Sequence, residues 1–469
     1  MLCRSAVRPV GEVRFLQPGR VIASPRLFLR HMTLTRYLKT FQDGDEPGSL
    51  ILFSAKKGSI ISIPSGMFAE LEAGSISEEE LKTLSDLGFL CEGPDAERKE
   101  MLGFIDDLNV ISRTFAAKVV MNLDCNLACK YCFEGQRKGK FYMTRDTADL
   151  FIAFVRDWAE GLEGRTGDEK IAITFYGGEP LLSLDLVAYL SERIKSIAEE
   201  EGIEYIAYIV TNGTLFTPRI VERLKPLGLR GAVVTLDGPT ELHDLFRPFK
   251  SGKCSFDRIV GNLREVCEMT GIQLGGNYMS DNYREFPRLL DFMLANGLTP
   301  DKVESVRFNP VTAESYGYGP VDFNEGCCSF NEPWLFEAGV YLSGEVLKRG
   351  YNGARSTLPG VCSLDMEDNY LVNYDGNIFK CPGLIGRDEF KVGDLKTGIR
   401  FKSQPQGRDC WKNEECLTCI YLPLCFGGCR QMRLVREGNM DGVECKKPYL
   451  DATLEAFVKQ DIKYGLSST

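Results

Sequence analysis

The stretch KVVMNLDCNLACKYC, residues 118–132, joins an apolar run to three closely spaced cysteines. Residues 118–123 are mostly β-branched or apolar, which is typical of a strand buried in a sheet. Cys125, Cys129 and Cys132 follow at once, so we expect them on the loop at the carboxyl end of that strand. Because parallel α/β folds place their chemistry at this end, the stretch predicts both a fold and a site.

Strand and helix patterns alternate from Ala116 to about Pro320. Strands are expected at 118–123, 171–176, 205–211, 231–236, 272–279 and 305–309, and helices between them at 145–162, 184–201 and 286–296. This alternation predicts an α/β fold in which helices cover a parallel sheet. Six such units predict a partial (β/α)6 barrel related to the TIM barrel.

The segments that flank the barrel differ from it in composition. Residues 1–31 carry six arginines against one acid and are expected to form a flexible basic tail. A hairpin pattern at 49–64, followed by a helix that Ser77 and Glu80 open as a capping box, predicts a winged-helix-like module. The expected divisions are the tail (1–31), the module (32–95), a linker helix (96–115), the barrel (116–320), a Cys-rich region (321–446) and a C-terminal helix (447–469).

Composition excludes several classes of function. The 469 residues carry a net charge of −10 without a Lys/Arg block, so we expect no nucleic-acid partner. No apolar run approaches the roughly 20 residues of a membrane helix, so we expect no membrane partner. Seventeen cysteines, an odd number, and two histidines favour metal ligands in a reducing, cytoplasmic setting over disulfides or His-based catalysis.

The spacing of the first three cysteines suits a particular metal group. Three thiolates hold only three irons of a four-iron cluster, which leaves one iron open to another ligand. The alternative is a structural zinc loop, but zinc asks for four ligands and the nearby sequence supplies no fourth.

This segment resembles the signature of the radical S-adenosylmethionine (SAM) superfamily, CxxxCxφC, with Tyr131 at the aromatic position φ. The resemblance continues at later strand ends, in Gly177-Gly178-Glu179-Pro180, in Thr211-Asn212-Gly213-Thr214, and in Asp237-Gly238-Pro239 with His243, Asp244 and Arg247. It implies a 4Fe–4S cluster on Cys125, Cys129 and Cys132. It also implies SAM contacts from Tyr131, Gly177, Gly178, Glu179, Pro180, Thr211, Asn212, Asp237 and Arg247.

The resemblance also implies the chemistry. The reduced cluster cleaves SAM to a deoxyadenosyl radical, which abstracts hydrogen from a carbon of the substrate. The electron is expected from a donor such as flavodoxin or ferredoxin. The sequence assigns no catalytic acid or base.

The C-terminal cysteines resemble the SPASM extension of radical SAM enzymes that modify peptides. The pattern is Cys362-x13-Gly376-x4-Cys381, then Cys416-x2-Cys419-x5-Cys425-x3-Cys429, and finally Cys445. The resemblance implies one auxiliary 4Fe–4S cluster on Cys362, Cys381 and Cys429, and a second on Cys416, Cys419, Cys425 and Cys445. The first is one ligand short, so either Cys327, Cys328 or Cys410 completes it or the site is open to substrate.

Two zinc ribbons are the alternative for this region, since CxxC pairs are common in them. With either metal, we expect the region not to fold without it.

The SPASM resemblance implies a precursor peptide as substrate, cross-linked through a thioether, carbon–carbon or related bond. The N-terminal module then either captures a leader peptide by strand addition or only stabilises the fold. A small-molecule substrate is the second hypothesis. A non-catalytic electron carrier is a third and weaker one, because the motifs after the strands would have no role. Anaerobic sulfatase maturation is disfavoured, because Pro382 stands where that family has an Asp after the cysteine.

Overall fold

The computed structural model describes residues 32–464 apart from 74, 133, 314–325 and 354–355. The basic tail expected at 1–31 lies outside the described residues. In the described part of the chain, no helix is both long enough and apolar enough to cross a membrane.

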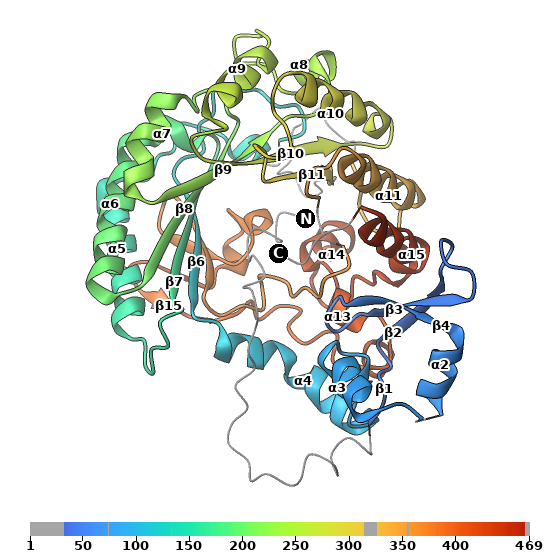
Figure 1. Cartoon of the computed structure of the whole chain (residues 1–469). Helices are drawn as coiled ribbons and strands as arrows, with labels where there is room; N and C mark the ends of the chain where they lie inside the picture. Colours follow the sequence, from blue (N-terminus) through green and yellow to red (C-terminus); the bar gives the residue numbers. More distant parts are fainter. Residues whose placement is uncertain (1–31, 74, 133, 314–325, 354–355, 465–469) are drawn as a thin grey trace.

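Six parallel strands form the barrel, and they lie in the sheet in the order of the sequence (Figure 1). They are β6 (Thr114–Val120), β7 (Lys170–Tyr176), β8 (Glu204–Thr211), β9 (Leu229–Thr235), β10 (Gly271–Tyr278) and β11 (Ser305–Pro310). Each strand follows its predecessor through a crossover, and the first crossover carries α5 (Arg145–Glu160). The predicted α/β partial barrel is therefore confirmed.

The first strand differs from its predicted bounds. It was expected at 118–123, but β6 begins at Thr114 and ends at Val120. Beyond β6, Met121 N still donates to Tyr176 O of β7 at 2.8 Å, but residues 121–123 also pair with a later segment: Leu123 N donates to Phe141 O at 2.9 Å, and Met143 N donates to Met121 O at 2.9 Å. The apolar pattern continues through residues 118–123, so sequence alone does not show where β6 ends and the pairing with residues 141–143 begins.

Helices cover the outer face of the sheet (Figure 1). Besides α5 they are α6 (Leu184–Glu201), α7 (Pro218–Leu224), α8 (Thr240–Phe246), α9 (Phe256–Val266) and α10 (Phe286–Ala295). Alternate strand residues such as Val119, Ile173 and Ile209 are fully buried beneath them. This packing leaves the carboxyl ends of the strands to the loops that carry the sequence motifs.

The Cys-rich region continues the barrel sheet. The strand β12 (Asn369–Val372) pairs in parallel with β6, and three short antiparallel strands follow it. These are β13 (Asn377–Phe379), β14 (Gly393–Asp394) and β15 (Gly398–Ile399). Beyond them lie only the short helices α12 (Glu414–Leu417), α13 (Leu422–Cys425) and α14 (Arg430–Glu437).

Two longer helices border this region. They are α11 (Pro333–Lys348) and the C-terminal α15 (Lys447–Lys463), which pack against each other beside the barrel (Figure 1). Gln460 of α15 donates from Nε2 to Val340 O of α11 at 3.0 Å.

The N-terminal module is a small antiparallel sheet with two helices. Its strands are β2 (Leu38–Gln42), β3 (Ser49–Ser54) and β4 (Ile60–Pro64), its helices are α2 (Ser65–Glu72) and α3 (Glu78–Asp86), and β1 (Thr33–Leu34) pairs with β5 (Leu90–Cys91). The capping box predicted for α3 is present, with Ser77 and Glu80 bonded reciprocally. The linker helix is α4 (Pro94–Ile111).

Candidate active site

The three cysteines of the first motif lie on the loop after β6, at the carboxyl end of the barrel. Cys125 is only 6% exposed, and its Sγ accepts a hydrogen bond from Leu127 N at 3.4 Å. The same sulfur accepts from Asn212 Nδ2 at 3.6 Å, across the gap to the loop after β8. Protein contacts alone therefore hold this loop against the loop after β8, which lies two strands away in the sheet.

The three thiols share one cation. Burial raises the pKa of Cys125, Cys129 and Cys132. Burial would lower the pKa of Lys138, but the charges of the three nearby sulfurs outweigh it and raise that pKa. Lys138 also forms a hydrogen bond with Cys132. Buried thiolates need positive charge nearby, so this loop suits a cationic metal group.

The spread of these thiols suits a cluster better than a single ion. Within the described ranges, no three His, Cys, Asp or Glu side chains converge as one metal ion would require. A 4Fe–4S cluster binds each thiolate to a different iron and so does not ask for that convergence. One buried and two half-buried thiols beside one lysine therefore fit a cluster in which one iron has no protein ligand.

Two glycines let the turn after β7 approach the cysteine loop. A Cβ atom at Gly177 would collide with the Asn122 carbonyl oxygen, and one at Gly178 with the Asp124 carbonyl oxygen. Gly178 N instead donates to Asn122 O at 2.9 Å, and Glu179 N donates to Asp124 O at 2.8 Å. The GGEP motif thus fastens β7 to the loop that carries Cys125, and any side chain at either glycine would separate them.

Glu179 joins this turn to the one after β8. Its carboxylate is fully buried and accepts from Thr211 Oγ1 at 2.8 Å, from Asn212 N at 2.8 Å and from Leu181 N at 3.0 Å. Pro180 is buried beside it as the first residue of the 3-10 helix η3 (Pro180–Ser183). Burial raises the pKa of Glu179, while the donors oppose that rise. Such a saturated carboxylate has a defined orientation at the floor of the site.

A second set of polar contacts connects the same loops. Asn212 Nδ2 donates to Asn126 Oδ1 at 2.8 Å, and Asn126 Nδ2 donates to Thr214 Oγ1 at 2.8 Å. Thr214 Oγ1 donates to Asn212 Oδ1 at 2.6 Å, which closes the ring. Sequence reasoning missed Asn126, and its position between two of the cysteines is the signal that was available.

Tyr131, Asp237 and Arg247 meet at the carboxyl end of β9. The Tyr131 hydroxyl bonds to the Asp237 carboxylate and accepts from Arg247 Nη1 at 2.8 Å. Asn277 of β10 donates from its backbone N to Asp237 Oδ1 at 2.7 Å and from Nδ2 to the Tyr131 hydroxyl at 3.1 Å. The structure thus brings these three predicted residues together. It adds Asn277, which no motif had indicated.

His243 supports this group through hydrogen bonds to Asp237 and Ser255. Its Nδ1 accepts from Asp237 N at 3.2 Å, so its Nε2 carries the proton and donates to Ser255 Oγ at 3.0 Å. Ser255 Oγ in turn donates to Arg247 O at 2.7 Å. Asp244 accepts from Ser255 N at 2.7 Å. The His–Asp–Arg pattern in the sequence is therefore a structural support for the β9 loop.

Four cysteines of the C-terminal region form one neighbourhood. The thiols of Cys416 and Cys419 each interact electrostatically with those of Cys425 and Cys445. Phe426, directly after Cys425, has a left-handed φ of 40°. The chain thus turns sharply after Cys425, before it reaches Cys429, which belongs to the other proposed set.

The other C-terminal cysteines gather around Arg430. Cys381 is 2% exposed and donates from Sγ to Gln431 Oε1 at 3.5 Å, while Cys429 directly precedes Arg430. The Arg430 guanidinium interacts with both Cys362 and Cys410.

Of the three candidate extra ligands, Cys410 is the one whose thiol interacts with Arg430. Cys327 is fully buried among the apolar side chains beneath α11, and Cys328 is exposed near Glu332. A Cβ at Gly427 would lie 2.9 Å from Cys410 Sγ, so the glycine gives this thiol room.

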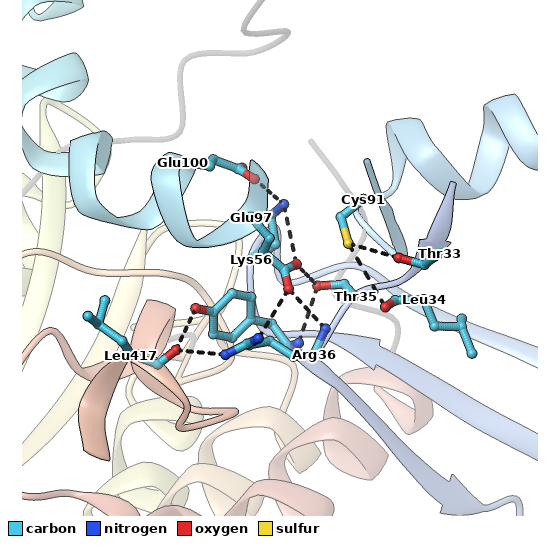
Figure 2. Close-up of polar contacts among 10 residues, drawn as sticks. Thr33, Leu34, Thr35, Arg36, Lys56, Cys91, Glu97, Glu100 and Leu417 are labelled. Carbon is cyan, nitrogen blue, oxygen red and sulfur yellow. Dashed lines mark hydrogen bonds and ion pairs between the residues drawn. The ribbon is translucent and has the colours of Figure 1, made fainter. Parts of the chain in front are cut away.

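A buried carboxylate ties the N-terminal module to α4 (Figure 2). Glu97 is 1% exposed and bonds to Thr35 Oγ1 and to Arg36 N, the latter at 3.1 Å. Its oxygens also lie 3.6 Å from Arg36 Nε and 3.8 Å from Lys56 Nζ.

Two residues of the module then reach the Cys-rich region, and Figure 2 labels one of them, Arg36, beside Leu417. Arg36 Nη1 and the Tyr37 hydroxyl both donate to Leu417 O, at 3.3 and 3.4 Å. Leu417 lies between Cys416 and Cys419, so the module rests on the CxxC turn itself. No local pattern in the sequence marks this contact between the module and the CxxC turn.

Comparisons with known proteins agree with this geometry. Residues 119–293 match the radical SAM superfamily. An uncharacterized protein of Methanocaldococcus jannaschii is 31% identical over 62% of this chain and 92% of its own length. The serine-type anaerobic sulfatase-maturating enzyme of Bacteroides thetaiotaomicron is 22% identical over 67% of this chain and 82% of its own.

The fold is also shared with a solved structure. Native anSMEcpe with bound AdoMet and a Cp18Cys peptide superposes with a TM-score of 0.55 at 16% identity, covering 75% of this chain and 97% of that one. From the family match, its motifs and these relatives, the chain belongs to the radical SAM superfamily, whose cofactors are a 4Fe–4S cluster and SAM.

Proposed function

We propose that this radical SAM enzyme modifies a ribosomally made peptide or protein, forming a thioether, carbon–carbon or related cross-link. The observation that carries the proposal is the junction at the barrel mouth, where Glu179 and the ring of Asn126, Asn212 and Thr214 bind the motif loops after β7 and β8 to the cysteine loop. An electron carrier would need the cysteines but not these surrounding loops. When bound, the cluster and SAM supply a radical that abstracts hydrogen from carbon.

The residues around the thiols have the role of holding SAM in one orientation. The proposed contacts are Tyr131, Gly177, Gly178, Glu179, Pro180, Thr211, Asn212, Asp237 and Arg247. Glu179 presents a carboxylate that cannot rotate, because backbone and side-chain donors occupy it. Tyr131 is held in place by Arg247 and Asn277, so its ring is a fixed wall of the site. Fixed groups lose little entropy on binding and exclude water from the radical.

The C-terminal cysteines are proposed to hold two auxiliary clusters. The neighbourhood of Cys416, Cys419, Cys425 and Cys445 supports one four-ligand set. For the other, we propose that Cys410 joins Cys362, Cys381 and Cys429, because its thiol and that of Cys362 share Arg430.

A peptide substrate draws support from the relatives and from the N-terminal module. The similar enzymes are named for maturing sulfatases, and the shared fold is seen with a bound peptide in anSMEcpe. In the described residues β4 pairs only with β3, so its other edge can accept an added strand. The opposite edge strand, β2, faces the Cys-rich region, where Lys39 lies over the Tyr421 ring at 5.4 Å. We therefore propose β4 as the edge that receives a leader peptide.

The experiment begins with SAM turnover by anaerobically purified, iron-loaded protein. The triple change Cys125→Ala, Cys129→Ala and Cys132→Ala should abolish deoxyadenosine formation, because no cluster remains to bind SAM. Cys254→Ala is the matched control, since that cysteine is exposed and belongs to none of the sets. Deoxyadenosine at the wild-type rate from the triple variant, or zinc in place of iron, would refute the proposal.

Substrate class is tested separately. Co-expression with short, Cys-containing peptides encoded beside the gene, followed by mass spectrometry, should show a loss of two hydrogens per cross-link. Turnover of SAM without any change in such peptides would favour the small-molecule alternative.

A further inference from the structure

Exposed apolar side chains gather beside the cysteine loop. Phe141, Tyr142 and Leu182 are 48%, 40% and 39% exposed. A cavity of about 370 Å³ opens beside Tyr142 and Leu182, lined by Tyr142, Met143 and residues 182–186. Apolar surface that stays in contact with water at a hollow is typical of a protein-binding site.

This surface is directly connected to the first cysteine. Residues 141–143 pair with residues 121–123, which lead into the cysteine loop. The Tyr142 hydroxyl donates to Asp124 Oδ2 at 2.6 Å, and Asp124 Oδ1 accepts from Cys125 N at 2.9 Å. Two hydrogen bonds therefore separate an exposed aromatic ring from the backbone of Cys125.

Basic residues border the same surface, although the chain as a whole carries a net charge of −10. Lys250 is exposed and its Nζ lies 2.9 Å from Asp124 Oδ1, on the carboxylate that Tyr142 also contacts. Lys140 is exposed directly before Phe141, and the one acid in the cavity lining, Asp185, is paired with Arg223 Nη2 at 2.7 Å. A partner with acidic surface would be attracted here and repelled by much of the remaining surface.

The surface lies outside the barrel, where a substrate for radical chemistry would not bind. Met143 directly precedes the N-cap of α5, and Leu182 lies in η3 directly before α6. Both helices cover the outer face of the sheet (Figure 1). A protein docked here approaches the cluster from outside, opposite to a substrate in the barrel.

We propose that this surface docks an acidic one-electron carrier protein, which reduces the cluster on Cys125, Cys129 and Cys132. The inference rests on the proposed function, because only a catalytic cluster needs this electron. In the docked complex the carrier's flavin or iron–sulfur centre is oxidised by one electron and the 4Fe–4S cluster is reduced by one. Phe141, Tyr142 and Leu182 supply the apolar contact, and Lys140 and Lys250 supply the steering charge.

The test compares two reductants on the same protein. Leu182→Glu and Lys140→Glu each add negative charge at the surface without touching the motif residues. Val110→Glu is the matched control: Val110 is 77% exposed near the end of α4, ahead of the amino end of β6. Deoxyadenosine formation is measured with dithionite and, separately, with a purified acidic flavodoxin kept reduced.

With flavodoxin, both surface variants should be slower by about tenfold, and added salt should slow the wild type, because docking is electrostatically steered. With dithionite they should match the wild type and Val110→Glu, since a small reductant needs no docking. Unchanged flavodoxin-driven rates would overturn the inference. Equal losses with both reductants would also overturn it, because the surface would then serve substrate binding or folding. If the wild type forms no deoxyadenosine even with dithionite, the proposed function fails as well.

Discussion

The barrel mouth and the Cys-rich region both gather thiols, but they do so by different means. Around Cys125 the backbone belongs to loops between long parallel strands, and side-chain amides and a buried carboxylate bind those loops together. Around Cys425 the regular elements are helices of four residues, and left-handed backbone at Phe426, Gly427 and Gly428 sets the path. The first site is organised by the fold. The second consists of short elements joined through buried apolar side chains such as Trp411, Tyr421 and Phe426, and the proposed auxiliary cluster would tie its cysteines together.

The N-terminal module is attached to the second of these regions, the Cys-rich one. Arg36 and Tyr37 both donate hydrogen bonds to the carbonyl oxygen of Leu417, inside the CxxC turn. Glu97 forms an ion pair with the same Arg36 (Figure 2). The proposed leader-binding strand therefore belongs to a module that rests on the turn where the second auxiliary cluster is proposed. This arrangement makes the contrast between the two regions testable.

The largest expected effect is that of removing the metal. Structural metal sites contribute on the order of 10 kcal/mol to folding, so anaerobic chelation should unfold residues 405–446 while leaving the barrel folded. Amide hydrogen exchange should show lost protection at α12–α14 and retained protection at β7–β9. The triple variant at Cys125, Cys129 and Cys132 is the control, since it should keep protection in both regions. Equal loss of protection in the barrel strands would contradict the contrast.

A smaller effect should follow from Cys410→Ala. If Cys410 is the fourth ligand of the first auxiliary cluster, the variant leaves one of about four irons without a protein thiolate. In the triple-variant background, the EPR spectrum of the reduced auxiliary clusters should shift, and an added small thiol should restore it. Cys328→Ala should leave the spectrum unchanged. An unaltered spectrum in Cys410→Ala would return the choice to Cys327, Cys328 or an open iron.

The module's anchor is expected to contribute less. Glu97→Gln removes the buried negative charge that faces Arg36 and Lys56, which costs about 1–3 kcal/mol of docking free energy. Hydrogen exchange at β1, β2 and Leu417 should accelerate together, with the barrel unaffected. Glu100→Gln is the matched control, because Glu100 pairs with the same Lys56 from the same helix but is exposed. If the two variants behave alike, Glu97 is not the anchor.

The smallest predicted effect is the loss of folding stability at low pH that follows from the buried His243 ring. Burial, with a further contribution from Arg247, holds the pKa of His243 well below its ordinary 6.5. The folded protein thus keeps a neutral ring, while the unfolded chain takes up a proton below pH 6.5, so stability should fall as the pH drops below that value. The contribution is at most about 1.4 kcal/mol per pH unit.

Thermal unfolding between pH 5.5 and 7 measures this effect. His243→Gln should flatten the slope of melting temperature against pH relative to the wild type. A variant with the wild-type slope would show that His243 does not titrate on unfolding.

Much of the fold and of the barrel site could be predicted because its signals are local. The helix Leu184–Glu201 appeared at its expected bounds, and the capping box at Ser77 formed as its spacing indicates. The motif residues after β6, β7, β8 and β9 all lie at the carboxyl ends of their strands. Each of these predictions needs only periodicity or spacing over a few residues.

What was missed depends on partners far along the chain. The end of β6 and the strand β12 are decided by pairings that sequence periodicity does not show. Asn277 reaches Tyr131 across 146 residues, and Arg36 reaches Leu417 across 381. No local pattern marks such residues before the fold brings them together.

The sequence by itself determined which residues we assign to the chemistry, because cluster ligation and glycine turns require particular residue types at particular short spacings. Only the tertiary structure decided how the loops are fastened to one another, that the module rests on the CxxC turn, and that an apolar, lysine-bordered surface adjoins Cys125. Those features are contacts between distant segments, and such contacts come into being only when the chain folds.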